Sequence, residues 1–215
     1  MPAFQDHSST KSLGHVNLMV DTLIANVDET DLRAMVRGLL SASTPAIAST
    51  FTDVARERLR RAAATALPPP RTLFAQVPET AGQDTGVETW AATPALRPVL
   101  RRTRAAYGAG IALDALGVLA AVVADATPSR WAPDSALEAL LAEIDADISQ
   151  AVESAKQECD AGRVDDPEAP QATRAALLAA LQAAEAAAAG WGGDFPFERG
   201  LASVQEWKPA MNTGR

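Results

Sequence analysis

Residues 134–162 have the sequence DSALEALLAEIDADISQAVESAKQECDAG. Their apolar positions recur at spacings of four, three, four, four, three and four: Leu137, Leu141, Ile144, Ile148, Val152, Ala155 and Cys159. The average of about 3.67 residues per turn is the nearly straight eleven-residue period, not the heptad period of a two-stranded coiled coil. Asp134 and Gly162 are start and stop signals for a helix. This segment therefore predicts one long amphipathic helix that packs in a bundle.

The segment before this helix is more strongly apolar. Residues 105–124 are apolar except for Tyr107, three Gly and Asp114. Twenty such residues match the thickness of a bilayer, so a membrane span is one interpretation. However, Ala and Gly favour insertion only weakly, and Asp114 near the centre would cost about 2.5–3.5 kcal/mol. The centre of a bundle also requires a helix that is apolar all round, so we expect a central core helix here, with membrane association as the alternative.

Three shorter helices are expected over residues 16–66, where apolar residues recur at helical spacing. The three groups are Val16, Met19, Val20, Leu23 and Ile24; Leu32, Met35, Val36, Leu39 and Leu40; and Ile47, Phe51, Val54, Ala55 and Leu59. Asp28 has the position of an N-cap, and Thr44-Pro45 is a second start signal. We predict a compact N-terminal three-helix unit. Residues 1–15 are polar, without the apolar segment of a secretory signal, so we expect a loosely ordered tail and an intracellular protein, cytoplasmic or nuclear.

The rest of the chain completes an all-α prediction. We expect a Pro-rich linker or loop over residues 67–93, a C-terminal bundle of antiparallel helices over 94–190, and a docking tail over 191–215. The last long helix, 171–189, is more than half Ala, and the whole chain holds 47 Ala among 215 residues. The predicted fold is therefore a helical bundle of five or six principal helices.

Two groups of residues are candidate protein-binding surfaces. One is an Arg cluster at the start of the C-terminal bundle, and the other is the apolar face of the tail: Arg97, Arg101, Arg102 and Arg104; and Phe195, Phe197, Leu201 and Trp207. The tail either closes over its own bundle, which we favour, or inserts into the groove of a partner.

Charge is distributed unevenly along this acidic chain, whose net charge is −8. Residues 56–104 hold nine Arg, whereas residues 134–168 hold eleven acidic residues. The favoured interpretation is intramolecular, with basic helix ends near the acidic helix. An Arg-lined site for an acidic segment of another protein is the second. Nucleic acid is the third and least favoured, because the overall charge opposes it and neither Lys nor aromatic residues accompany the Arg residues.

The residue census disfavours most enzyme chemistry. The only His residues, His7 and His15, lie in the polar tail, and Cys159 lies on the apolar stripe without another Cys. No GxxxxGK[ST] loop is present. Glu143 and Asp147 form an acidic pair at i,i+4, which we expect on a solvated helix face. We therefore expect no catalytic, metal or cofactor site. The remaining enzyme alternative is a carboxylate-based or small-ligand-binding helical protein, which would need two carboxylates converging in a cavity.

Some Leu and Pro positions carry a resemblance to a known family. They are Asp28-Glu-Thr-Asp-Leu32, Leu39-Leu40 and Thr44-Pro45-Ala-Ile47, followed by Tyr107 with Leu113, Leu116 and Leu119. Over about half of the chain these positions resemble fungal nuclear proteasome-tethering factors. The resemblance implies an all-helical bundle that associates with the nuclear envelope, and a basic N-terminal segment that engages the proteasome. The Lys-rich form of that segment has no counterpart in this sequence.

Together these observations predict a non-enzymatic helical adaptor or scaffold subunit that binds other proteins in a complex. A proteasome-tethering role, a helical enzyme or small-ligand protein, and membrane association through residues 105–124 are the alternatives. Self-association is left open.

Overall fold

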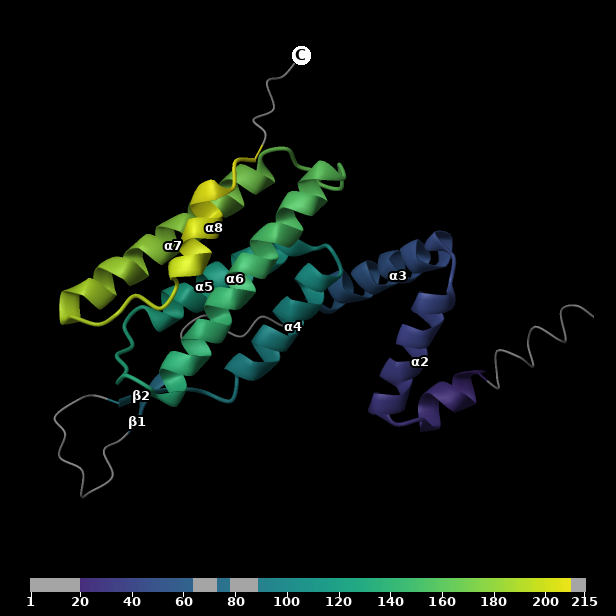
Figure 1. Cartoon of the computed structure of the whole chain (residues 1–215), viewed down its shortest axis with the longest axis horizontal. Helices are drawn as coiled ribbons and strands as arrows, with labels where there is room; N and C mark the ends of the chain where they lie inside the picture. The colour runs from purple at the N-terminus through teal and green to yellow at the C-terminus, as the bar shows by residue number, and fades with distance from the viewer. Residues whose placement is uncertain (1–19, 64–72, 78–88, 210–215) are drawn as a thin grey trace, which may run out of the picture. The chain divides into compact units, whose positions relative to one another are not determined.

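The computed structural model describes residues 20–63, 73–77 and 89–209 of the chain (Figure 1). Helices make up 74% of these residues, so the helical prediction is confirmed. Residues 20–26 are helical, and the further elements are α2 (Glu29–Ala42), α3 (Pro45–Ala63), β1 (Phe74–Val77), β2 (Thr89–Ala92), α4 (Leu96–Gly108), α5 (Ala112–Ala126), α6 (Ala136–Asp160), α7 (Ala169–Trp191) and α8 (Glu198–Glu206). The chain divides into two units, Met1–Asp53 and Val54–Arg215. The predicted tail over residues 1–15 lies outside the described residues.

The hairpin of β1 and β2 corrects the all-α prediction. The two strands pair antiparallel, with Phe74 opposite Ala92, inside the segment predicted as a linker. Phe74 is buried, and the Leu73 N–H donates a 2.8 Å hydrogen bond to the Asp125 carboxylate of α5. Strands of four residues are too short to show a periodic pattern, so their stability comes from this attachment to the helices.

The predicted core helix over residues 105–124 is divided into two helices. α4 ends at Gly108, and α5 begins at Ala112 after Gly110, whose φ of 76° is favourable only for glycine. This break, together with α8, raises the number of helices in the described residues to eight. None of the helices in the described ranges is long and apolar enough to cross a bilayer.

The core of the second unit lies where α4, α5, α6 and α7 meet. α5 is apolar on most sides, and its buried residues are Ala112, Ala115, Leu116, Leu119, Val122, Val123 and Ala126. Six positions of the predicted α6 stripe are buried as well: Leu137, Leu141, Ile144, Ile148, Val152 and Ala155. α7 packs closely on α5 because most of its residues are Ala, and it ends at Gly192 in the left-handed conformation. The long amphipathic helix is therefore confirmed.

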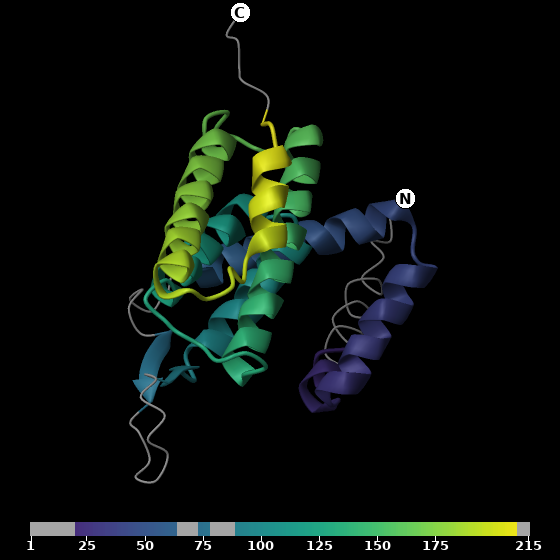
Figure 2. The same ribbon diagram turned by 60° about the vertical axis from the view of Figure 1, so that its left-hand side comes forward.

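The predicted docking tail closes over its own bundle. α8 lies against α6 and α7 (Figures 1 and 2). Phe197 and Trp207 are 2% and 3% exposed, and Phe195 and Leu201 pack against the same core. The Arg174 guanidinium of α7 donates a 3.0 Å hydrogen bond to the Val204 carbonyl near the end of α8. Phe197 and Trp207 are thus core residues, and Phe195 and Leu201 are partly buried against the same core.

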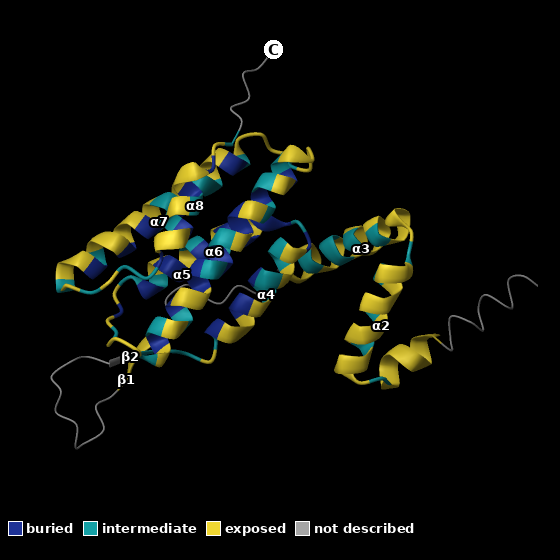
Figure 3. Ribbon diagram, viewed as in Figure 1, coloured by how far each residue is buried: buried dark blue, intermediate teal, exposed yellow. Residues whose placement is uncertain are grey.

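Within residues 20–63 the N-terminal segment is helical as predicted, and its apolar faces are largely exposed. None of the residues in Glu29–Ala42, all of which the structure describes, is buried. Figure 3 shows α2 largely in the colour of exposed residues, whereas α5 and α6 contain many buried residues. Helical periodicity predicts which residues share a face, but it does not supply the surface that covers them.

Candidate functional site

The second unit is organised by three buried carboxylates on α6. Asp145, Asp147 and Glu158 are each 4–6% exposed. This corrects the expectation that Asp147 shares a solvated face with Glu143, because only Glu143 is exposed. Buried charges are tolerated in proteins when they are paired or hydrogen-bonded, and each of these three carboxylates has such a partner.

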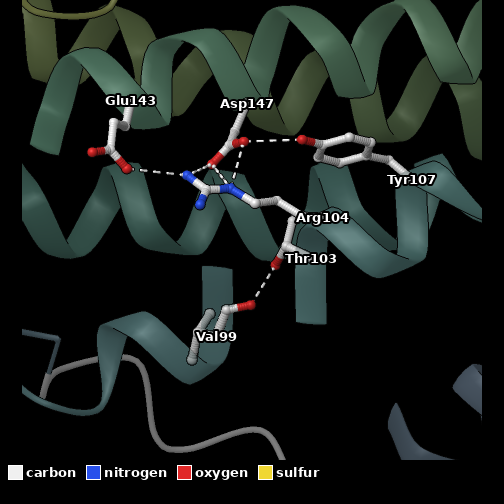
Figure 4. A network of polar contacts seen from close by, with 6 residues as sticks. All are labelled: Val99, Thr103, Arg104, Tyr107, Glu143 and Asp147. Carbon is white, nitrogen blue, oxygen red and sulfur yellow. Dashed lines mark hydrogen bonds and ion pairs between the residues drawn. The ribbon is translucent and has the colours of Figure 1, made fainter. Parts of the chain in front are cut away.

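Asp147 binds two side chains of α4 (Figure 4). Arg104 Nε lies 2.9 Å from both Asp147 oxygens, and Arg104 Nη2 lies 2.8 Å from Oδ2. The Tyr107 hydroxyl donates a 2.9 Å hydrogen bond to Oδ1 of the same carboxylate. Glu143 is a weaker partner, at 3.3 Å from Arg104 Nη2. Arg104 therefore pairs with the acidic helix of its own chain, as the favoured interpretation of the charge pattern expects.

Arg104 and Tyr107 both stay protonated near neutral pH. Hydrogen bonding to Asp147 raises the pKa of Arg104 further above its ordinary value. Burial, followed by the hydrogen bond to Asp147, raises the pKa of Tyr107 to about 12. Neither group exchanges a proton near neutral pH, so both stay bound to Asp147 and clamp α4 to α6.

The other two carboxylates bind the N-terminal ends of neighbouring helices. Glu158 accepts a 2.7 Å hydrogen bond from the Ala112 N–H at the start of α5. Asp145 accepts a 2.6 Å hydrogen bond from the Gly200 N–H in the first turn of α8. Burial raises the pKa of Asp145, partly offset by the N–H groups of α8. Both carboxylates satisfy helix donors that would otherwise be buried without a partner.

The four predicted Arg residues do not form one cluster. Arg104 is bound to α6, whereas Arg97 and Arg101, one turn apart on α4, are exposed. Arg102 lies on another side of α4, where it lines a groove of about 400 Å³ between α4 and α5 together with Asp114. Asp114 is exposed in this groove, so it lies outside the core.

A larger groove of about 810 Å³ lies between β2, the start of α4 and the first half of α6. Trp90, Leu137 and Leu140 provide apolar lining, and Arg97 and Glu143 provide charge. The Trp90 Nε1 atom is buried and has no hydrogen-bond partner among the described residues. This groove was not predicted, because Trp90 was expected to lie in a linker.

The structure also bears on metal and thiol chemistry. Within residues 20–63, 73–77 and 89–209, no group of three or more His, Cys, Asp or Glu side chains is placed to hold a metal ion. His7 and His15 lie outside these ranges. Burial and the neighbouring acidic residues raise the pKa of the partly buried Cys159, so its thiol stays protonated and weakly nucleophilic at neutral pH.

A scan against protein-family models, a search of curated proteins and a search of solved structures each found no match for this chain.

Proposed function

We propose that this chain is a non-enzymatic helical adaptor whose N-terminal helices bind an amphipathic helix of another protein. The observation that supports this proposal is the set of exposed apolar side chains on the three helices of the first unit. It consists of seven side chains that are 43–57% exposed: Val20, Leu23, Ile24, Met35, Leu39, Ile47 and Phe51. We call these residues the N-terminal stripe. Apolar residues at helical spacing pack well against a second helix with the same pattern.

The free energy gained by burying these seven side chains is large enough to drive binding of a partner. Fully burying one such side chain contributes about 1.5–3 kcal/mol, so covering seven half-exposed ones contributes about 5–10 kcal/mol. That gain is comparable with the cost of association, which fits a complex of moderate affinity. α2 has only 14 residues, and helices of this length are marginal in water unless their apolar face is covered.

The test compares Leu39→Asp with Ala34→Asp. Both substitutions place the same charge at an exposed position of α2, but only Leu39 belongs to the stripe. We expect proteins that co-purify with the full chain from its host to be lost with Leu39→Asp and kept with Ala34→Asp, while circular dichroism stays helical for both. The purified partner should then bind the purified wild-type chain with no other protein present. Equal capture by the two variants would refute the proposal.

Light scattering of the purified chain provides the second measurement. We expect a monomer at micromolar concentration. A dimer that Leu39→Asp dissociates would show that a second copy covers the stripe, and would refute the proposal of a different protein as its partner.

A further inference from the structure

We propose a second binding site, independent of the N-terminal stripe: the groove between β2, α4 and α6 binds an extended acidic peptide segment of a partner protein. The segment adds to the open edge of β2 and places its carboxylates at Arg97 and Arg101. We call this site the β2 groove.

The hydrogen-bond register shows which backbone groups are open. The Thr93 N–H donates to the Leu73 carbonyl, and the pairing of β1 with β2 continues in the same antiparallel register. Hydrogen-bonded and non-hydrogen-bonded pairs alternate along an antiparallel ladder, so Ala91 faces β1 while the N–H and C=O groups of Trp90 and Ala92 point away from it. The described residues provide no partner for these groups. An extended peptide of about four residues matches the length of β2 and would bond to them.

The side chains of the groove favour an apolar contact. The Trp90 ring packs against the core and lines the groove, while its Nε1–H group is buried without a partner in the described part of the chain. The ring therefore offers the peptide its apolar surface. Leu137 and Leu140 line the groove beside it and offer an apolar surface for one side chain. The volume of about 810 Å³ lies within the range of peptide and ligand sites.

The charge of the groove identifies the chemistry of the peptide. Arg97 lines it, and Arg101 lies one turn further along the same face of α4. Both guanidinium groups are exposed, and neither has an ion pair among the described residues. Glu143, the acidic residue in the lining, shares Arg104 with Asp147, so these three side chains together carry one negative charge. Arg97 and Arg101 add two positive charges, so the positive charge at this end of the groove exceeds the negative by one, and these two guanidinium groups can form charge-assisted hydrogen bonds with carboxylates.

Fluorescence anisotropy with the full chain tests this proposal. The probe is a fluorescein-labelled Glu-Val-Glu-Val-Glu peptide, and Lys-Val-Lys-Val-Lys is the opposite-charge control. We expect binding of the acidic probe alone, weakened about tenfold by Arg97→Glu with Arg101→Glu. The matched control, Arg58→Glu with Arg60→Glu on the exposed surface of α3, makes the same change in net charge and should alter binding less than about twofold. Equal weakening by both pairs, or no binding, overturns the proposal.

Two further measurements separate a strand in the groove from a diffuse charge effect. N-methylation of alternate peptide nitrogens should abolish binding, because it removes the donors that pair with β2. The indole N–H resonance of Trp90, assigned with Trp90→Phe, should shift on addition of the acidic probe while those of Trp131 and Trp207 stay in place. An unmoved Trp90 resonance, or preferred binding of a single-stranded DNA probe, overturns the proposal. Leu39→Asp should leave probe binding unchanged, so the two proposals fail separately.

Discussion

The Arg104–Asp147 pair predicts an asymmetry between its two partners. The Arg104 side chain is 40% exposed, whereas that of Asp147 is 8% exposed. Arg104→Met keeps the aliphatic stem but leaves the Asp147 carboxylate buried with the Tyr107 hydroxyl as its remaining side-chain donor. Breaking a buried pair in this way costs about 3–5 kcal/mol when both partners are buried, and we expect about 2–4 kcal/mol here because water reaches part of this site.

Removing the acid should cost less than removing the base. Asp147→Ala leaves a guanidinium that water can solvate and a half-buried phenol, so we expect a loss of about 1–2 kcal/mol. The double variant contains no unpaired buried charge, and it should be more stable than Arg104→Met alone. Glu143→Ala is the control, because this exposed carboxylate lies 3.3 Å from the same guanidinium and should contribute less than about 0.5 kcal/mol.

Urea unfolding followed by tryptophan fluorescence measures these differences. All four Trp residues lie in the second unit, so the signal reports on the bundle and not on the N-terminal helices. A loss of 2–4 kcal/mol corresponds to a fall in melting temperature of about 4–16 °C for a protein of this size. An Arg104→Met variant no less stable than Glu143→Ala, or a double variant less stable than Arg104→Met, would contradict the predicted asymmetry.

Tyr107 is the only Tyr in the chain, so phenolate absorbance titrates it directly, with an expected midpoint near its pKa of about 12. Because this pKa is raised on folding, the stability of the fold should decrease as the pH rises from about 10 through 12. Asp147→Ala removes the hydrogen bond and should lower the midpoint of the Tyr107 titration. An unchanged titration midpoint would contradict the role of this hydrogen bond. Gly200→Ala should destabilise the bundle by about 1–3 kcal/mol, because the new Cβ would lie 2.8 Å from Ile148 Cγ2. Gly117→Ala, which meets nothing within 4 Å inside α5, should instead stabilise by about 0.5–1 kcal/mol, and thermal melts of the two variants decide the sign.

The helices were predictable where the apolar pattern is long. The α6 stripe could be predicted because its apolar residues recur with a period close to that of the α-helix. α6 ends at Asp160, close to the predicted stop at Gly162. The break at Gly110 was harder to predict, because Ala, Leu and Val continue on both sides of it. A residue distant in sequence also stabilises the start of α5: Glu158, 46 positions beyond Ala112, accepts a hydrogen bond from the Ala112 N–H.

The buried acids were missed for a related reason. A stripe of large apolar residues predicts one buried face, but α4, α5 and α8 all contact α6 and bury a wider arc. Asp145 and Asp147 fall inside this arc, between Ile144 and Ile148. The sequence did contain a signal of this burial, because the two short acidic residues lie between the β-branched Ile144 and Ile148. The groove could not be predicted, because it requires the hairpin, whose strands are positioned by contacts distant in sequence.

The three carboxylates of α6 also help to fix one arrangement of the helices in a chain so rich in Ala. Ala side chains allow helices to approach closely, but they provide few knobs to prevent one helix from sliding along another. Each buried acid on α6 binds one fixed point on a neighbour: Arg104 and Tyr107 of α4, the first residue of α5, and Gly200 of α8. A shift of one turn would leave all three charges buried without partners, at several kcal/mol each. We infer that these carboxylates set the register of the bundle, which keeps the walls of the β2 groove at a constant separation.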